Sequence, residues 1–596
     1  MKRDFQHITR SQFVLTYGPG AIIETKKGPR IIPSMEHGLG AKYFSKHIFE
    51  SFEITETRLS KMIPKSSEKA PGSRIVALPT NAGLKIPSNS RIYSTYVFPA
   101  WKVCYGRKAS HRPLLYNGPK CPMCKTDEES SATRFVSACP EGHLDEVNWQ
   151  YAVHDKSKCN PPYYYWKANG SSLSDIIVEC PQCNSKKTMK EIYSLQFFCT
   201  GRNPEKEAPA SKYPPFYTSP NRTKNCEHKM KIIQRQSTSL RVSETMTLLT
   251  IPEFDNPISR MLQKKEVSIA LNMIKMYPNF EQLTTQDFIE LLSKLLKNLT
   301  NDEVISTLTN KIKKDGVSEF FNLHRRLNAE DQTFLDLMYE EFESLLSAGG
   351  KVTEHFSMSS PKNIIPNLSY VPELQVSAVN KIRTVTVQSG YTRLINLNEN
   401  QDPGKVYSGV WLDGDIWYPG YEGFGEGIFI TFKDGKLPDI SSKSAYSKWK
   451  MYKNSGNEQK SNWSDVTFEP GFVWLHTLSH AIIRSLSAYT GYSAASLRER
   501  VYISRDGSNG GILIYNTSPG DDSGMGGLAG TVDSFSDIIN NAIDNLLICS
   551  NDPLCIDVNK SSESINGSAC YSCLLISETS CEHRNLWLDR HIVIGI

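Results

Sequence analysis

Cysteine spacing constrains this chain more than any other feature of its 596 residues. Five cysteines lie close together near the C-terminus: Cys549, Cys555, Cys570, Cys573 and Cys581. A tetrahedral zinc ion takes four thiolate or imidazole ligands, and a C-x2-C pair supplies two of them from one tight turn. We therefore predict that the first four form a zinc site, and that Cys581 is left over or replaces Cys549. The alternative is a set of reduced thiols that pack as small apolar side chains.

A second cysteine-rich region runs from about residue 101 to 250. Its first pair, Cys121-Pro-Met-Cys124, is followed at a zinc-finger-like distance by Cys139 and His143. Three thiolates and one imidazole make a common structural zinc site, so we predict that these four residues share an ion. Cys104 competes for a place in this set.

The same region contains a further pair, Cys180-Pro-Gln-Cys183. We predict that it is completed by Cys199 and Cys226 across a Pro-rich loop, with His228 as a substitute ligand. Buried, metal-free thiols are again the alternative. With the C-terminal set, the sequence predicts two or three Zn²⁺ ions per chain.

The length of the chain exceeds what one hydrophobic core usually supports, so several domains are expected. We predict an α+β, multi-domain protein with zinc-ribbon-like modules, a helical middle segment and a C-terminal α/β zinc-binding domain. The expected divisions are an N-terminal segment that packs on the core (1–100), a zinc-knuckle and ribbon region (101–250), a helical insert (251–350), a strand-rich domain (351–470) and the C-terminal zinc-binding domain (471–596).

Local patterns support these divisions. Leucines recur at helical spacing after Thr284, and Asp287 three residues later makes a capping-box start. Residues 382–387 and 427–432 alternate in the manner of strands, whereas 472–484 is typical of a helix. Two glycines flank Pro19 near the N-terminus, and we expect a sharp structural turn there.

Charge and hydropathy exclude some classes of protein. The N-terminus lacks the apolar run of a signal peptide, and no stretch approaches the roughly 18 apolar residues of a membrane span. We therefore predict a cytoplasmic protein without a membrane partner. In a reducing cytosol, 14 cysteines in C-x2-C patterns indicate metal rather than disulfides. A net charge of +5 is weak support for nucleic acid.

One segment places basic side chains beside aromatic rings, in the run Lys448, Trp449, Lys450, Tyr452 and Lys453. Cations for phosphates and rings for bases are what a single-strand groove uses, so these residues are candidate nucleic-acid contacts. An amphipathic surface helix explains the same pattern.

Motifs for nucleotide chemistry are missing from the sequence. There is no G-x4-G-K-[ST], and Gly350-Lys351 is followed by valine. We therefore expect neither a motor nor an enzyme with a small-molecule substrate. Asp415 and Glu426 lie in a strand-rich segment, which keeps a metal-dependent nuclease as an alternative without strong support.

A helical pair, His476 and His480, also falls short of an enzyme motif. A zincin needs glutamate where this chain has Thr477, so peptidase chemistry is not expected. We interpret both histidines as structural.

Several motifs taken together resemble the DrmB family, the helicase-partner proteins of DISARM antiphage defence systems. The residues that support this resemblance are 11–21, 134–136 with 139–145, 425–427, 475–480, 524–530 and the run from Cys570 to Arg590. The part from about 470 onward also resembles the zinc-binding domain behind the motor of MrfA-type repair helicases. In that comparison Cys549, Cys555, Cys570 and Cys573 match the four ligands.

The resemblance implies a non-catalytic subunit whose partners are a separate DrmA-type helicase and DNA. The helicase would supply ATP hydrolysis, while this chain helps to engage DNA and stimulates the ATPase. Two alternatives remain at this point: a metal-dependent nuclease, and an architectural adaptor that binds only protein.

Overall fold

The computed structural model describes most of the chain, in these ranges: 5–63, 73–154, 159–207, 226–252, 257–262, 264–277, 283–297, 299–300, 302–327, 333–394, 404–454, 469–518, 527–556, 566–577 and 579–595. The chain divides into two compact units. Unit 1 comprises Met1–Thr55, Ile63–Met246 and Thr386–Tyr421, and unit 2 comprises Glu56–Met62, Thr247–Val385 and Glu422–Ile596. The five-part division expected from the sequence stays a prediction.

The largest sheet of unit 1 has six antiparallel strands in the order β13-β12-β11-β7-β6-β8. Their bounds are β6 (Trp101–Cys104), β7 (Leu114–Asn117), β8 (Ser130–Ala132), β11 (Tyr163–Ala168), β12 (Ile176–Glu179) and β13 (Lys186–Thr188). Helices α5 (Trp149–His154) and α6 (Met189–Tyr193) lie beside this sheet. Buried Trp149 packs edge-on against Trp166 of β11, with ring centroids 6.0 Å apart. This aromatic core holds the strand ends from which the cysteine loops emerge.

A second sheet of unit 1 has four antiparallel strands in the order β10-β9-β15-β14. The strands are β9 (Phe135–Ala138), β10 (Leu144–Asp145), β14 (Phe197–Phe198) and β15 (Lys229–Gln234). In the central pair, Ala138 lies opposite Lys231. The end of β9 and the start of β15 are therefore neighbours, although nearly 100 residues separate them in the sequence.

The N-terminal part of unit 1 begins with α1 (Arg10–Leu15), which Thr9 and Gln12 cap reciprocally. The predicted turn follows it. Gly20 has a φ of 81°, and a Cβ there would come within 2.6 Å of the Tyr391 ring, so glycine is required on both counts. The remaining elements of this part are β1 (Ile22–Thr25), β2 (Gly28–Ile31), α2 (Met35–Gly38), α3 (Lys46–Ser51), β3 (Glu53–Ile54), β4 (Ser73–Ala77), β5 (Tyr96–Val97), β20 (Val406–Tyr407) and β21 (Val410–Leu412).

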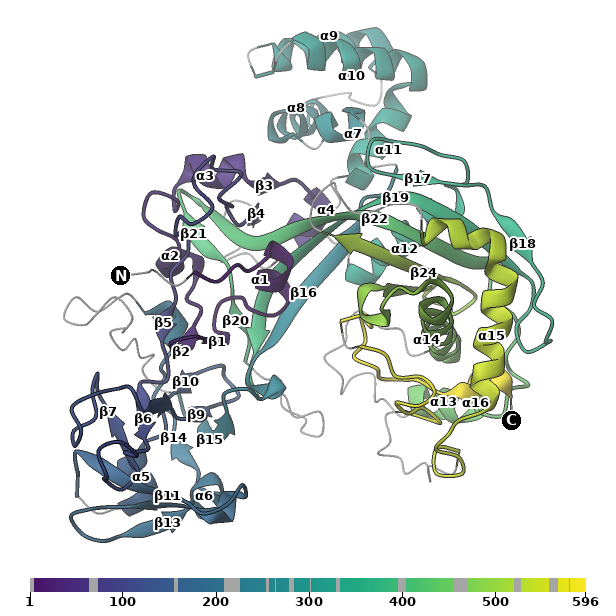
Figure 1. The fold of residues 1–596 in the computed structure, drawn as a ribbon. Coiled ribbons are helices and arrows are strands. Elements are labelled where there is room, and N and C mark those ends of the chain that lie inside the picture. Colours follow the sequence, from purple (N-terminus) through teal and green to yellow (C-terminus); the bar gives the residue numbers. More distant parts are fainter. Residues whose placement is uncertain are drawn as a thin grey trace. The chain divides into compact units, whose positions relative to one another are not determined.

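Long antiparallel strands form the framework of unit 2; helix α14 packs against two of them, β23 and β24, and helix α15 packs against α14 (Figure 1). The strands are β16 (Val242–Leu249), β17 (Ser357–Met358), β18 (Lys362–Ile364), β19 (Leu374–Thr392), β22 (Asp415–Lys436), β23 (Arg498–Ile503) and β24 (Asn509–Ser518), and β16, β19 and β22 also contribute residues to unit 1. The helices are α13 (Tyr446–Asn454), α14 (Pro470–Thr490), α15 (Phe535–Leu547) and α16 (Arg590–Ile594). Helix α14 is buried along most of its length, so its polar side chains face protein rather than water.

The predicted helical middle segment is confirmed. It contains α7 (Pro257–Leu262), α8 (Lys265–Lys275), α9 (Thr285–Leu296), α10 (Asp302–Asp315), α11 (Val317–Leu327) and α12 (Phe334–Leu346), and α4 (Thr57–Met62) also belongs to unit 2. Helices α7 to α11 share an apolar core that includes Leu271, Phe288 and Leu308. The Thr284 hydroxyl and the Asp287 carboxylate form the predicted capping box at the start of α9.

The expected fold class, α+β with cysteine-rich modules, is confirmed by this arrangement of sheets, helices and ligand clusters. Across the described ranges, every helix is either too short or too polar to cross a lipid bilayer.

Candidate metal centres

All fourteen cysteines of the chain lie in five groups of four potential metal ligands. Within each group the ligand atoms are no more than 4.8 Å apart, and every cysteine is free. We name the groups the knuckle site (Cys104, His111, Cys121, Cys124), the ribbon site (Cys139, His143, Cys199, Cys226), the helix-end site (His154, Cys159, Cys180, Cys183), the four-cysteine site (Cys549, Cys555, Cys570, Cys573) and the buried site (His476, His480, Glu499, Cys581).

The distances within these groups fit tetrahedral zinc. Ligands at zinc–sulfur distances of about 2.3 Å in a tetrahedron place two sulfurs roughly 3.8 Å apart. The observed Sγ–Sγ separations are 3.8 Å for Cys104 and Cys124, 3.7 Å for Cys159 and Cys180, and 3.8 Å for Cys555 and Cys573. A disulfide needs about 2.05 Å. Thiols that merely pack in cores would not all gather in fours, so metal binding explains the pattern better than buried free cysteine.

The ribbon site forms where two hairpins of the four-stranded sheet end side by side. Cys139 follows β9 and His143 precedes β10, whereas Cys199 follows β14 and Cys226 precedes β15. Because β9 pairs with β15, the two hairpin ends meet. The Cys139 and Cys199 sulfurs are 3.6 Å apart, and His143 Nδ1 lies 3.3 Å and 3.5 Å from them.

This geometry corrects two of the predicted ligand sets. Cys139 and His143 do not join Cys121 and Cys124, and Cys199 and Cys226 do not join the 180–183 pair. The prediction matched each C-x2-C pair with the next ligands along the chain, whereas strand pairing decides which pairs meet. The proposed substitute His228 lies outside the five groups found among the described residues, and its Nε2 is 3.2 Å from a Glu141 oxygen.

The knuckle site combines the end of β6 with two loops. Cys104 is the last residue of β6 and lies opposite Ser130 of β8, which brings it to the loop with Cys121 and Cys124. Its fourth member is His111, whose Nδ1 is 2.7 Å from the Arg112 carbonyl oxygen. That bond places the ring proton on Nδ1, and leaves the Nε2 lone pair facing the sulfurs at 3.6–3.7 Å.

The helix-end site contains two residues that the sequence prediction missed, His154 and Cys159. His154 is the last residue of α5, and its Nδ1 lies 3.0 Å from the Gln150 carbonyl oxygen. Its buried Nε2 has no hydrogen-bond partner in the structure, which is the state expected of a metal ligand. A count could have found this site: nine cysteines lie between residues 101 and 250, enough for three sets of three thiolates completed by histidines.

The four-cysteine site agrees with the predicted C-terminal set. Cys549 and Cys570 are 3.4 Å apart, and Cys570 and Cys573 are 3.7 Å apart. The backbone N–H of Asn551 lies 3.4 Å from the Cys549 sulfur, a bond that stabilises a thiolate. Cys581 neither replaces Cys549 nor is left over, because it lies in the buried site.

Each of the four cysteine-rich sites has one readily ionised thiol. Hydrogen bonds lower the pKa of Cys124 to about 6, through His111 first, and that of Cys183 to about 6, through Ser185 first. A hydrogen bond from Cys139 lowers the pKa of Cys199 to about 4. Burial opposes ionisation of Cys570, yet bonds from Cys549 and nearby backbone bring its pKa to about 6. One thiolate per site is therefore ready to accept a cation at neutral pH.

Exposure predicts the order in which the sites lose metal. Cys183 is the exposed ligand among these groups, whereas all four members of the buried site are shielded from solvent. During a chelator time course with pulses of an alkylating reagent, we expect label on Cys183 first and on Cys581 last. Mass spectrometry of the peptides measures this order. Equal labelling rates for both cysteines would contradict the assignment.

The segment predicted to contact nucleic acid forms the helix α13. Trp449 is buried, and its indole N–H donates to Asp589 at 3.0 Å, so the predicted stacking of this ring on a base is wrong. A helix turns one face inward every three to four residues, and Trp449 lies on that face. Lys453 pairs with Glu469, Lys448 and Tyr452 are half-buried, and Lys450 is exposed.

The two carboxylates of the nuclease alternative are both engaged by protein. Asp415 lies 3.1 Å from an Arg74 nitrogen. Glu426 is buried and accepts the backbone N–H groups of Leu528 and Ala529 at 2.9 and 3.2 Å. These partners give the carboxylates a structural role and do not favour catalysis.

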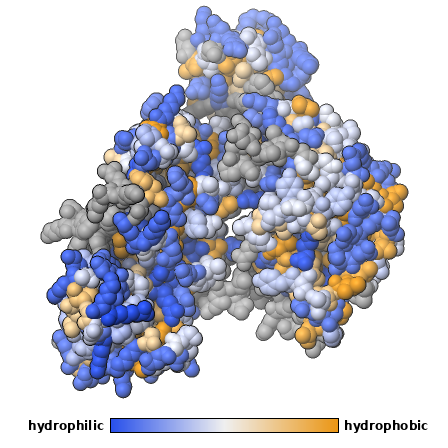
Figure 2. Space-filling model, in the orientation of Figure 1, coloured by the Kyte–Doolittle hydropathy of each residue, from blue (hydrophilic) through white to orange (hydrophobic). Residues whose placement is uncertain are grey.

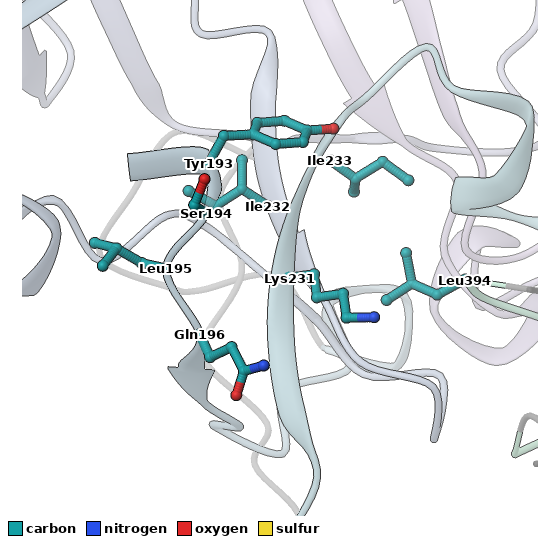
Figure 3. Close-up of a pocket in the computed structure, with 8 residues that line it drawn as sticks. All are labelled: Tyr193, Ser194, Leu195, Gln196, Lys231, Ile232, Ile233 and Leu394. Carbon is teal, nitrogen blue, oxygen red and sulfur yellow. The ribbon is translucent and has the colours of Figure 1, made fainter. Parts of the chain in front are cut away.

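A surface cavity of about 300 Å³ in unit 1 is lined by residues 193–196, 231–233 and Leu394. Lys231 is its charged lining residue, and its side chain extends toward Leu394 (Figure 3). No carboxylate, histidine or cysteine lines it, and Tyr193 and Lys231 are its titratable lining residues. The visible face of the nearby cysteine-rich strands is mostly hydrophilic (Figure 2).

Comparisons with known proteins agree with these features. Residues 9–242 match a domain of unknown function (DUF8724), and residues 478–574 match the MrfA Zn-binding domain. The chain is 27% identical over 608 aligned residues to the DISARM protein DrmB of Bacillus paralicheniformis. This match covers 93% of this chain and 96% of that protein. The crystal structure of the DUF1998 helicase MrfA bound to DNA is similar at 12% identity and a TM-score of 0.18, over 34% of this chain and 22% of the MrfA chain. The resemblance to DrmB proteins and to the MrfA zinc-binding domain is confirmed.

Proposed function

We propose that this chain is a non-catalytic, zinc-stabilised subunit of a DISARM-like antiphage defence system. It partners a DrmA-type helicase, helps that helicase to bind DNA and stimulates its ATPase. Similarity to a DISARM protein along nearly the whole of both chains carries the proposal. The match to the zinc-binding domain of a helicase adds support for the helicase partner.

Zinc has a structural role in this proposal. Four cysteine-rich sites each offer four protein ligands, which leaves no open coordination position for a substrate. We therefore propose four ions in these sites, rather than the two or three expected from the sequence. The ions hold loops at strand ends and so shape the surfaces that meet the partner and DNA.

Co-expression with the helicase of the same defence system tests the partner assignment. We expect the two proteins to co-purify and the ATPase rate to rise when this chain is added with DNA. A test variant is the chain with Cys199→Ser, which should lose the ribbon site and with it part of the stimulation of the helicase ATPase. An ATPase rate that never depends on this chain would contradict the proposal.

Nucleic-acid binding is tested at Lys450, the exposed lysine of α13. One phosphate contact contributes about 0.9 to the slope of log K against log salt, so Lys450→Ala should weaken DNA binding and reduce that slope by about 0.9. The measurement is fluorescence anisotropy with labelled DNA across a salt series. Lys351→Ala, an exposed lysine of the same unit, is the control and should change neither quantity.

The same DNA experiments distinguish the alternatives. An adaptor that binds only protein would show no change for Lys450→Ala and no binding by the wild-type chain. A nuclease would cleave labelled DNA with Mg²⁺ or Mn²⁺, and cleavage lost in Glu426→Gln would favour that alternative.

A further inference from the structure

Four side chains from three separate segments meet in the interior of unit 2. His476 and His480 lie one turn apart on α14, Glu499 belongs to β23, and Cys581 lies in the C-terminal segment. The two histidines and the glutamate are 0% exposed, and Cys581 is 5% exposed. Imidazole, carboxylate and thiolate are all zinc ligands, and such groups are rarely buried together without a partner of opposite charge.

We propose that this buried site is a fifth metal centre, which binds a zinc-class divalent cation in a closed, structural coordination sphere. The distances fit such an ion. His476 Nε2 lies 2.9 Å from Glu499 Oε1 and 3.3 Å from Cys581 Sγ, and His480 Nε2 lies 3.2 Å from the same oxygen. Tetrahedral ligands around zinc are separated by about 3.3 Å for nitrogen and oxygen and about 3.6 Å for nitrogen and sulfur.

The hydrogen bonds of His480 favour a cation at this place. Its Nδ1 is 3.0 Å from the Leu574 carbonyl oxygen, which can only accept, so the ring proton lies on Nδ1. In the neutral ring Nε2 then presents a lone pair to the Glu499 oxygen, and two acceptors face each other. A proton or a metal ion between them removes this repulsion. A metal ion also satisfies His476 and Cys581, which a single proton does not.

The surroundings of the other two ligands suit a metal ion as well. The Cys581 sulfur accepts the backbone N–H groups of His583 and Asn585, each at 3.3 Å, an arrangement that stabilises a thiolate. The Ser479 hydroxyl donates to the second oxygen of Glu499 and fixes the carboxylate.

A metal here would hold the C-terminal segment against α14 and β23. The next residues along both segments also bind each other, because Arg500 donates to Glu582 at 2.9 Å. The site also adjoins the four-cysteine site, since Leu574 follows Cys573 directly. The match to the MrfA zinc-binding domain spans residues 478–574, so His476 and Cys581 lie outside it.

Anomalous diffraction from crystals of the full chain at the zinc edge tests the proposal directly. We expect a peak among His476, His480, Glu499 and Cys581, in addition to peaks at the four cysteine-rich sites. Those four peaks serve as internal references. Their presence without a fifth peak would overturn the proposal and leave a proton shared between His480 and Glu499 as the explanation.

Metal analysis in solution gives an independent measurement. Cys581→Ala and Glu499→Gln should each contain one zinc ion fewer per chain than the wild type. His324→Asn, which alters a buried histidine outside the five groups, should retain the full number. Unchanged zinc content in both ligand variants would overturn the proposal. If neither variant folds, the wild-type diffraction experiment decides the question.

Discussion

A chain in which Cys573 is replaced by serine is expected to lose one zinc ion and the fold of the segment around the four-cysteine site. Cys573 is buried in the main hydrophobic core of unit 2, together with Cys549 and Cys555. Structural zinc contributes roughly 10–16 kcal/mol in isolated zinc-finger peptides. We expect a smaller loss here, about 3–5 kcal/mol, because the large core around the site remains.

The measurements for Cys573→Ser are zinc content per chain and hydrogen exchange of residues 549–577. A two-unit chain need not unfold in one step, so local exchange is a better readout than a single melting temperature. Ser572→Ala is the matched control, since it alters the exposed neighbour and keeps all four sulfurs. Full zinc content with unchanged exchange in Cys573→Ser would refute the assignment of this ligand.

Replacement of Arg500 by methionine is expected to destabilise unit 2 by about 3–5 kcal/mol, the usual result of breaking a buried ion pair from one side. Arg500 is 1% exposed, and its guanidinium is 2.8 Å from a Glu341 oxygen. It also donates to Glu582 at 2.9 Å and to the Thr247 carbonyl at 2.8 Å. Without it, the Glu341 carboxylate stays buried, with the Leu249 N–H at 2.7 Å as its shortest remaining bond.

The pH dependence of Arg500→Met follows from Glu341. Burial already raises the pKa of Glu341 above its ordinary value, and loss of the Arg500 charge raises it further. A carboxyl group whose folded-state pKa is raised contributes most stability when protonated, and this stability is lost as pH rises above the unfolded-state pKa. The destabilisation should therefore be smallest in acid and largest at neutral pH.

Two further variants make the Arg500 prediction specific. The double variant with Glu341→Leu removes the stranded carboxylate and should recover part of the lost stability. Arg505→Met is the control, because Arg505 pairs with Asp336 at the surface and is 72% exposed, so its loss should change stability by less than about 1 kcal/mol. Hydrogen exchange across a denaturant series measures the free energy of unfolding of unit 2 in the Arg500→Met chain, the double variant and the Arg505→Met chain. Equal effects for Arg500 and Arg505 would contradict the account.

Features encoded within short stretches of chain could be predicted. The four ligands of the four-cysteine site lie between Cys549 and Cys573, so the chain itself keeps them close. The capping box at Thr284 depends on one turn of backbone, and the structure contains it. Helical and strand-like segments were recognised by the same local periodicity.

Features that depend on distant segments could not be predicted in the same way. Trp449 has the sequence context of a base-stacking residue, yet tertiary packing buries it against Asp589. His154 and Glu499 belong to no ligand motif in the sequence. Each becomes a candidate ligand only because a helix end or a strand places it beside cysteines from elsewhere.

By itself, the sequence determined the chemistry of this protein: fourteen thiols in patterns that suit zinc, and a resemblance along most of the chain to a DISARM protein. Only the tertiary structure decided which candidate ligands lie together. The pairing of β9 with β15 joins Cys139 to Cys199 and separates it from Cys121, its nearer neighbour in sequence. Coordination needs four atoms within a few ångströms, and the sheet register sets those distances.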